Sequence, residues 1–217
     1  MLSHGDSNSG GKKTNMNLLI QPADVFAGCF FSFLDSHMVG GFKVKLNLEL
    51  VYKKQGGCEV EKLLVNPIGT IKTGQDGACI VVDEKYVPAL KGLKGFSHVV
   101  VVWWFHEFDN EEARNMMQVQ SPYKSSPPSL GTFATRSPLR PNPVALSVVQ
   151  AIHIDENQGI IQIPFIDANE GSPVIDLKPY TPSLDRVESP HVPEWCRHWP
   201  GSLEKSAYFD WAGEFNF

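Results

Sequence analysis

Two arginines and three prolines lie within nine residues, at positions 135–143. Proline removes competing backbone conformations, so we expect a stiff loop that holds the guanidinium groups of Arg136 and Arg140 in place before any ligand binds. A guanidinium offers a planar fork of donors that matches a carboxylate or a phosphate. The pattern also fits a rigid connector with two solvated arginines, so the loop alone leaves both interpretations open.

Other candidate side chains lie next to apolar runs. Residues 99–105 are the longest uninterrupted apolar run, which is typical of a buried strand, and His106 and Glu107 follow it directly. A histidine at the end of such a strand is commonly a boundary residue with a structural hydrogen bond. Asp176 and Lys178 alternate with apolar residues, so they share one face of a strand and could simply pair with each other.

Composition narrows the class of protein. The chain has 217 residues, a net charge of −5, 42% hydrophobic and 20% charged residues, a balance that excludes wholesale disorder. The acidic total argues against a general nucleic-acid coat, because neutralising phosphates requires clustered Lys and Arg. Of the 16 prolines, 13 lie beyond residue 120, which argues against a helical bundle in the second half.

The location and redox state follow from what the chain lacks. No apolar run approaches the roughly 20 residues of a membrane helix, so we expect no membrane span. Residues 25–34 are apolar, but Pro22 and Asp24 interrupt the segment before them, which disfavours a secretion or lipidation signal. The four cysteines are widely spaced without a CxxC pair, so we predict reduced thiols in the cytoplasm and no metal site.

Short strands dominate the expected secondary structure. Strict alternation over 42–52 predicts a half-buried strand, and 58–65 is its expected hairpin partner. Pro88 is expected to begin a helix that ends at Gly92 or Gly95, and Asn110 to cap a second helix. Further strands are expected at 68–72, 79–82, 99–105, 144–154, 160–163 and 174–177. The pattern predicts a mainly β fold, a small closed or strongly curved β-barrel with a few short helices.

Four segments together resemble one known family. Residues 133–143 read FATRSPLRPNP and are followed by Leu146-Ser147, which closely resembles the signature of the TrmO/YaeB (TsaA-like) family of S-adenosylmethionine-dependent tRNA methyltransferases. The other three segments occur in the family's order: NPIGTIKT at 66–73, GFSHVVVVWWFHEF at 95–108 and GSPVIDLKPYTPSLD at 171–185. The resemblance covers residues 66–185.

The resemblance implies a fold, a cofactor and a reaction. The family is a dimer of small β-barrels, so we expect a homodimer that binds S-adenosylmethionine where these loops converge, near the subunit interface. The implied acceptor is tRNA, at the exocyclic nitrogen of threonylcarbamoyl-adenosine next to the anticodon. Two alternatives stay open: a methyltransferase for a small molecule or a protein, and a non-enzymatic module that binds S-adenosylmethionine.

The resemblance also implies site residues. Arg136 matches the cofactor-contacting arginine and is expected to clamp the methionine carboxylate, while Leu146 lies where the family packs the cofactor against a strand. The acidic loop at 167–170 is expected to accept hydrogen bonds from ribose hydroxyls or the ammonium group. The expected cofactor set is His106, Glu107, Arg136, Leu146, Asp167, Ala168, Asn169 and Glu170. The expected catalytic residues are Asp176, Lys178 and Tyr180, and the expected RNA contacts are Lys124, Arg140 and Asn142.

These features predict four regions. We expect a flexible N-terminal extension at 1–37, a β-hairpin extension at 38–65, the cofactor-binding barrel at 66–185 and an acidic, aromatic tail at 186–217. The aromatic density of the tail suggests docking on its own domain or on a dimer partner more than base stacking. Bacterial members of the family carry a cofactor-loop insert after the first strand, an arginine-rich segment before the arginine loop and a further C-terminal domain. This chain has only a short turn at 74–77, only Lys124 within 118–130, and the acidic tail.

Overall fold

A hairpin precedes the main body of the protein. The computed structural model describes residues 48–53, 60–74 and 77–216. Strands β1 (Leu48–Lys53) and β2 (Val60–Val65) pair antiparallel, from Leu48 opposite Val65 to Lys53 opposite Val60. The predicted hairpin is confirmed over these residues, while 42–47 and 54–59 lie outside the described part.

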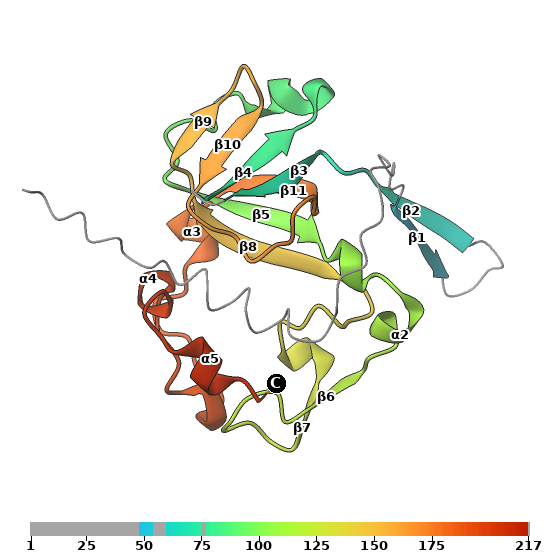
Figure 1. Ribbon diagram of the computed structural model, residues 1–217, viewed down its shortest axis with the longest axis vertical. Helices are drawn as coiled ribbons and strands as arrows, with labels where there is room; N and C mark the ends of the chain where they lie inside the picture. Colours follow the sequence, from blue (N-terminus) through green and yellow to red (C-terminus); the bar gives the residue numbers. More distant parts are fainter. Residues whose placement is uncertain (1–47, 54–59, 75–76, 217) are drawn as a thin grey trace, which may run out of the picture.

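The main body is one antiparallel sheet of seven strands (Figure 1). Its strands are β3 (Gly69–Gly74), β4 (Gly77–Val82), β5 (His98–Trp104), β8 (Val144–Gln150), β9 (His153–Asp155), β10 (Ile160–Ile163) and β11 (Pro173–Pro179). The spatial order is β8-β5-β11-β3-β4-β10-β9. Strand β5 therefore lies between β8, which carries Leu146, and β11, which carries Asp176 and Lys178.

The sheet is open, so the prediction of a small closed or strongly curved β-barrel is wrong. Strands β8 and β9 are the two edges, and no ladder joins them among the described residues. The two residues between them explain why. The N–H of Ala151 donates to Ser97 beside β5, whereas the N–H of Ile152 donates to Gln162 in β10. The chain thus passes from β8 to β9 while bonded to other segments, so no ladder forms between these two edge strands.

The core lies on one face of the sheet. In β5, the side chains of Val99, Val101 and Trp103 are buried in the core, and the intervening residues face the other side. The buried core residues are Ile71, Ile80, Val82, Leu90, Val99, Val101, Trp103, Ala145, Val149, Ile154, Ile161, Ile163, Ile166 and Val174. On the opposite face, which we call the outer face, Leu146, Val102 and Asp176 form a row across β8, β5 and β11.

Short helical turns connect the strands. They are η2 (Glu84–Leu90), η3 (His106–Phe108), α2 (Glu111–Arg114), η4 (Thr132–Ala134), α3 (Pro182–Asp185), η5 (Glu194–Cys196), α4 (Leu203–Ser206) and α5 (Trp211–Glu214). The Asn110 cap is confirmed, because its side chain accepts from Ala113 N at 2.9 Å. The helix expected to begin at Pro88 is instead a 3₁₀ helix that starts at Glu84. Tyr86 N donates to Asp83 O and so closes the turn earlier.

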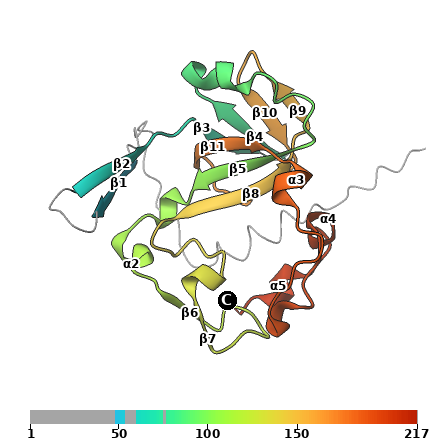
Figure 2. The ribbon, with the colours of Figure 1, turned by 180° about the vertical axis from the view of Figure 1, so that it is seen from behind.

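Two further differences concern the second half. The expected strand at 144–154 is divided into β8 and β9, because the hydrogen bonds of residues 151–152 go to different strands. A small hairpin of β6 (Gln118–Gln120) and β7 (Ser129–Gly131) was not predicted. In both views of the ribbon, α5 and the end of the chain lie beside this hairpin (Figures 1 and 2).

Two findings concern membranes and thiols. Within the residues described, no helix is long and apolar enough to cross a membrane. Cys79 and Cys196, the two cysteines in the described ranges, are both free thiols.

Candidate functional site

The arginine loop, residues 135–143, is held by its own second arginine. Arg140 donates from Nε to Ser137 O at 2.8 Å, and from Nη2 to Thr135 O at 2.7 Å and Thr132 O at 3.3 Å. Burial, together with the nearby positive charge of Arg136, lowers the pKa of Arg140. The carbonyl oxygens of the loop therefore converge on this guanidinium, which fixes the backbone around Arg136.

A third arginine anchors the loop from outside. Arg114, at the end of α2, donates from Nη1 to Pro141 O at 3.1 Å and from Nε to Asp109. Burial alone would raise the pKa of Asp109, but hydrogen bonds from Arg114 and Trp104 outweigh it and lower the pKa. The N–H of Phe105 also donates to Pro143 O at 2.8 Å. The loop is thus fixed against the end of β5, directly before His106.

Arg136 is the arginine that this arrangement leaves exposed. Its one hydrogen bond to another described residue runs from Nη1 to Leu146 O at 3.3 Å. Leu146 itself is 50% exposed on the edge strand β8, and Phe133, three residues before Arg136, is 85% exposed. An exposed guanidinium therefore stands beside exposed apolar surface.

A second cluster forms where η3 meets the loop before β11. Ser172 Oγ lies 3.3 Å from His106 Nδ1, and Asn169 donates from Nδ2 to Glu107. Glu107 also lies 3.8 Å from His106 Nε2. Four predicted cofactor residues are thereby linked or adjacent: His106, Glu107, Asn169 and, one residue further on, Glu170.

The two acids of the 167–170 loop have opposite environments. Burial alone would raise the pKa of Glu170, but the N–H of Thr73 (2.6 Å) and the ammonium of Lys72 (2.9 Å) outweigh it and lower the pKa. Asp167 reaches solvent, yet the protein around its carboxyl raises its pKa by desolvation. Ala168 packs against the core. Glu170 is therefore tied to β3, whereas the carboxyl of Asp167 is desolvated without an ion pair or hydrogen bond to another described residue.

The predicted catalytic residues are spread along β11. Lys178 Nζ lies 2.6 Å from Asp176 Oδ2, and this pair raises the pKa of Lys178. Tyr180 instead packs edge-on against His98, with ring centroids 6.1 Å apart. His98 begins β5 and His106 follows its end, so Tyr180 lies about 20 Å or more from His106, at about 3.3 Å per residue. The structure places Asp176 in the row with Leu146 and places Tyr180 at the other end of the strand.

The predicted RNA contacts are not gathered into one group. Lys124 is exposed in the loop between β6 and β7, where its N–H donates to Glu214 O at 3.0 Å. Asn142 is exposed beside Pro143, and the guanidinium of Arg140 is engaged with loop carbonyls. Asn142 and Arg140 lie in the arginine loop, while Lys124 lies against the tail.

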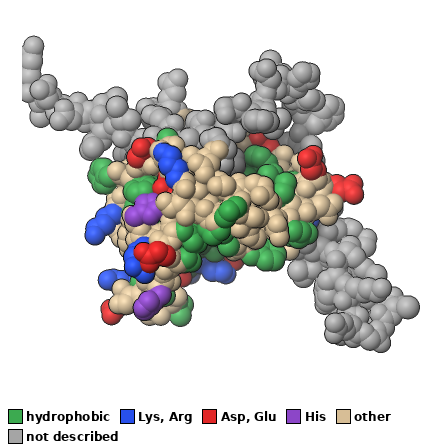
Figure 3. Space-filling view, turned by 90° about the horizontal axis from the view of Figure 1, so that it is seen from below, with side chains coloured by type: hydrophobic (Ala, Val, Ile, Leu, Met, Phe, Trp, Pro, Cys, Tyr) green, Lys and Arg blue, Asp and Glu red, His purple; other side chains and the backbone are tan. Residues whose placement is uncertain are grey.

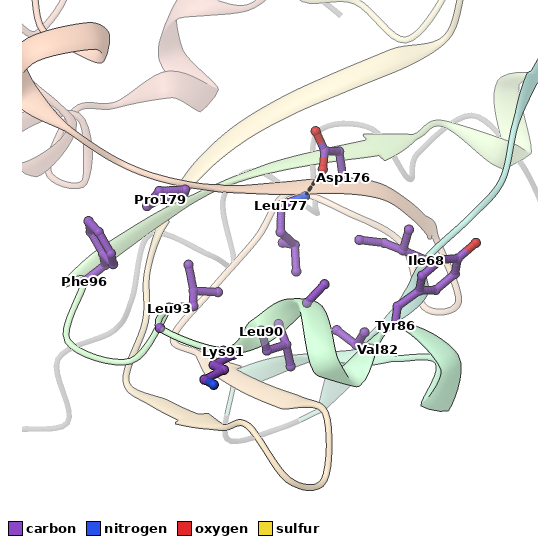
Figure 4. Close-up of a pocket in the computed structure, with 12 residues that line it drawn as sticks. Ile68, Val82, Tyr86, Leu90, Lys91, Leu93, Phe96, Asp176, Leu177 and Pro179 are labelled. Carbon is purple, nitrogen blue, oxygen red and sulfur yellow. Dashed lines mark hydrogen bonds between the residues drawn. The ribbon is translucent and has the colours of Figure 1, made fainter.

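A cavity of about 320 Å³ lies between η2 and β11, and Asp176 is among the residues that line it. It arises because β3 pairs with β11 only at Pro173 and Val174, which leaves the rest of β11 facing η2. Figure 4 shows Leu90, Leu93 and Leu177 converging on the cavity while the carboxyl of Asp176 points away from it. The cavity is an apolar opening in the core with no link to the arginine loop.

The side chains of these clusters are suited to binding a charged organic molecule. Arg136 can bind a carboxylate, Leu146 provides an apolar surface, and Glu107, Asp167 and Asn169 provide acceptors. Across the described part of the chain, no group of three or more His, Cys, Asp or Glu side chains is arranged to hold a metal ion.

Three contributors to this arrangement were missed from the sequence: Arg114, Ser172 and Phe133. Arg114 ends a helix whose cap was recognised, but nothing in its position indicated that its guanidinium reaches Pro141. Ser172 is fully buried beside His106 although serine is usually exposed. Phe133 reads as an ordinary apolar residue, and its exposure appears only in the structure.

Comparisons with known proteins point the same way as the sequence. Residues 65–186 match the tRNA-methyltransferase O N-terminal domain family. A probable S-adenosyl-L-methionine-binding protein from Methanocaldococcus jannaschii is 36% identical over 121 residues, which are 56% of this chain and 94% of that protein. The tRNA (adenine(37)-N6)-methyltransferase of Escherichia coli is 30% identical over 121 residues, which are 55% of this chain and 51% of the relative.

Among solved structures, a crystal structure of TrmO from P. aeruginosa is 27% identical, covers 62% of each chain and superposes with a TM-score of 0.48. The family match spans more than half of the chain and contains the arginine loop, the His106 cluster and β11. The chain therefore belongs to the tRNA-methyltransferase O N-terminal domain family, as the sequence predicted.

Proposed function

We propose that the chain is an S-adenosylmethionine-dependent methyltransferase that acts on tRNA. The observation that carries this proposal is the exposed guanidinium of Arg136 on a loop fixed by Arg140 and Arg114. Relatives named as S-adenosylmethionine-binding proteins and as a tRNA methyltransferase support it. The finer acceptor, the exocyclic nitrogen of threonylcarbamoyl-adenosine next to the anticodon, is part of the same proposal, as is a cytoplasmic location.

The residues present fit the cofactor. A carboxylate suits Arg136, whose described contacts leave most of its donors available, and an adenine or a methionine side chain suits the exposed surface of Leu146. Asp167, Asn169 and Glu107 would accept from ribose hydroxyls and the ammonium group, and a carboxylate such as that of Glu107 tolerates a positively charged sulfur. When bound, the cofactor would supply an activated methyl group: an acceptor nitrogen would attack the methyl carbon in line, and S-adenosylhomocysteine would leave as a neutral thioether.

The chain's own contribution is positioning and one proton acceptor. Rigid placement of reactants supplies much of the rate of such displacements. We assign Asp176 to the acceptor side, because it lies in the row with Leu146 and its carboxylate can take the proton that the acceptor nitrogen loses. Lys178, whose Nζ lies 2.6 Å from Asp176 Oδ2, holds that carboxylate in its orientation.

The RNA part of the proposal rests on the surface around Arg136. Single-stranded RNA is recognised by aromatic rings on which unstacked bases can lie, with arginine beside them. Phe133 is 85% exposed on the η4 turn, close to Arg136 in sequence. Asn142 and Arg140, in the same loop, would serve phosphates and base edges there, and Lys124, which lies against the tail, would contact the RNA from outside that loop, although the chain as a whole is acidic.

A homodimer is also part of the proposal. On the outer face, Leu146 is half-exposed at the edge strand, and its neighbours Val102 and Val148 are partly exposed. Apolar residues on an edge strand are suited to contact with a second copy. Light scattering of the purified chain should give twice the monomer mass, and a Val148→Glu substitution should reduce it to one.

Methyl transfer to bulk tRNA tests the central claim. Labelled S-adenosylmethionine incubated with the chain and bulk tRNA that carries threonylcarbamoyl-adenosine should label one modified adenosine, identified by mass spectrometry of the digested nucleosides. Affinity for tRNA should fall steeply with salt if the basic groups contact phosphates. Label that appears only in small molecules or in protein would mean that the acceptor is not tRNA. Cofactor binding without any methyl transfer would indicate a non-enzymatic binding module.

A further inference from the structure

The tail builds a small aromatic core of its own. Tyr123, in the loop between β6 and β7, stacks on Trp195 with ring centroids 5.6 Å apart, and packs against Trp199 at 4.8 Å and Phe215 at 5.7 Å. The three tail residues lie beyond the family match, which ends at residue 186. Figure 3 views the molecule from this end, where hydrophobic side chains are exposed across the middle and most of the Lys and Arg side chains lie to the left.

A buried carboxylate ties the two ends of the tail together. Glu214 is 6% exposed; its Oε1 accepts from Trp199 Nε1 at 3.1 Å, and its Oε2 lies 3.0 Å from His198 Nε2. A buried acid requires such partners, because its desolvation is otherwise strongly unfavourable. Glu214 therefore fixes α5 against the segment that carries the tryptophans.

The end of the tail binds the β6–β7 loop through its backbone. Glu214 O accepts from Lys124 N at 3.0 Å, Phe215 forms an antiparallel bridge with Tyr123, and Asn216 donates from Nδ2 to Ser121 O at 2.9 Å. Ser121 has a φ of +36°, a backbone conformation that residues other than glycine rarely adopt. The tail thus holds a loop that its own sequence does not favour.

That loop leads directly to the arginine loop. Strand β7 runs into η4, where Thr132 donates from N to Met117 O at 3.0 Å and from Oγ1 to Met116 O at 2.7 Å. Arg140 binds Thr132 O and Thr135 O in turn. Burial raises the pKa of Tyr123, and the nearby Cys196 and Glu214 raise it further. The positive charge of Arg136 lowers the same pKa, so Arg136 and Tyr123 are close enough to interact.

We propose that the tail is a positioning element of the cofactor site: by holding the loop at 121–124 it keeps η4 and the arginine loop, and therefore Arg136, in the arrangement that binds the cofactor carboxylate. The inference rests on the proposed function, because it assigns Arg136 to the cofactor. It gives the tail a role in cofactor affinity, whereas packing alone would give it a role only in stability.

Titration calorimetry of the full chain with S-adenosylhomocysteine tests the proposal. Glu214→Ala should weaken affinity about tenfold while the number of binding sites per chain stays unchanged, because the loop is misplaced and not unfolded. Glu214→Gln keeps an acceptor for Trp199 and should recover most of the affinity. Tyr208→Ala, at an 83% exposed position in the same tail, is the matched control and should bind like the unaltered chain.

The outcomes separate the two claims. A lower number of sites at unchanged affinity would mean that the tail only stabilises the fold, which would overturn the inference. If Glu214→Ala does not fold, Asn216→Ala decides, because it removes only the exposed side-chain hydrogen bonds to Ser121 O and Oγ and should weaken affinity about threefold. Unchanged affinity would overturn the inference. An unaltered chain that does not bind S-adenosylhomocysteine would overturn the proposed function as well.

Discussion

The arginine loop and strand β11 both carry charged residues that the sequence singled out, but the structure treats their charges differently. In the loop, Arg140 and Arg114 bind backbone carbonyls and leave the guanidinium of Arg136 exposed. In β11, Asp176 and Lys178 bind each other at 2.6 Å, and both are exposed. Two arginines, Arg140 inside the loop and Arg114 outside it, hold the loop backbone and leave a third, Arg136, exposed. In β11 the two charged side chains pair with each other.

This difference indicates where ligand affinity should lie. An unpaired cation on a rigid loop gains most from an incoming anion, because no existing partner has to be displaced. An exposed ion pair contributes little to stability and can be rearranged at small cost. We therefore expect substitutions in the loop to change cofactor affinity and substitutions in β11 to change the rate of transfer.

The largest effect is expected for Arg136→Ala. Loss of a charge-assisted pair with the cofactor carboxylate should weaken binding of S-adenosylhomocysteine by about 100-fold or more, measured by calorimetry. The matched control is Arg186→Ala, which removes an exposed arginine outside the loop and should leave affinity unchanged. Equal affinities for the Arg136 variant and the unaltered chain would remove the distinction between the two regions.

Arg140→Ala should have a smaller effect on affinity and a clear effect on stability. Three carbonyl contacts are lost, and we expect about 2 kcal/mol of destabilisation, a fall in melting temperature of about 4–8 °C, and affinity weakened about 30-fold. Thermal unfolding and calorimetry measure both. Arg140→Lys keeps one donor group, so its stability and affinity should lie between those of Arg140→Ala and those of the unaltered chain. A variant that keeps its affinity while losing stability would show that Arg140 does not position Arg136.

The sequence predicted much of this architecture, and the failures have physical causes. Periodicity located β10 at its observed bounds, and side-chain chemistry identified the Asn110 cap, because both are local properties. The openness of the sheet depends on where the N–H groups of Ala151 and Ile152 donate, and those partners lie on strands distant in the sequence. Residue type also identified Arg136 as a candidate but not its exposure, which depends on Arg114 and Arg140 holding the loop.

Substitutions in β11 should change the rate of methyl transfer and leave cofactor affinity unchanged, the opposite of what we expect for the loop. Asp176→Asn should lower kcat by about tenfold or more and leave the affinity for S-adenosylhomocysteine unchanged, because the carboxylate is assigned to the acceptor proton. Tyr180→Phe is the matched comparison, since Tyr180 packs on His98 at the far end of β5, and its kcat should change less than twofold. A larger loss for Tyr180→Phe than for Asp176→Asn would move the catalytic assignment to the other end of the strand.

The smallest effects concern the two acids at 167–170, which repeat the contrast within four residues. Glu170 is paired, so its pKa is lowered; the stability it contributes is present above its unfolded pKa of about 4.3 and is lost as pH falls through its lower folded value. Asp167 is desolvated without a described partner, so its pKa is raised and its ionisation opposes folding as pH rises through the raised value.

Carbon NMR of the carboxyl groups should resolve the titrations of Glu170 and Asp167 on opposite sides of their ordinary pKa values. Urea unfolding of Glu170→Gln should show a weaker loss of stability on acidification, whereas Asp167→Asn should be at least as stable as the unaltered chain at neutral pH. Coincident titrations of the two acids would mean that the Lys72 and Thr73 contacts do not hold Glu170 in solution.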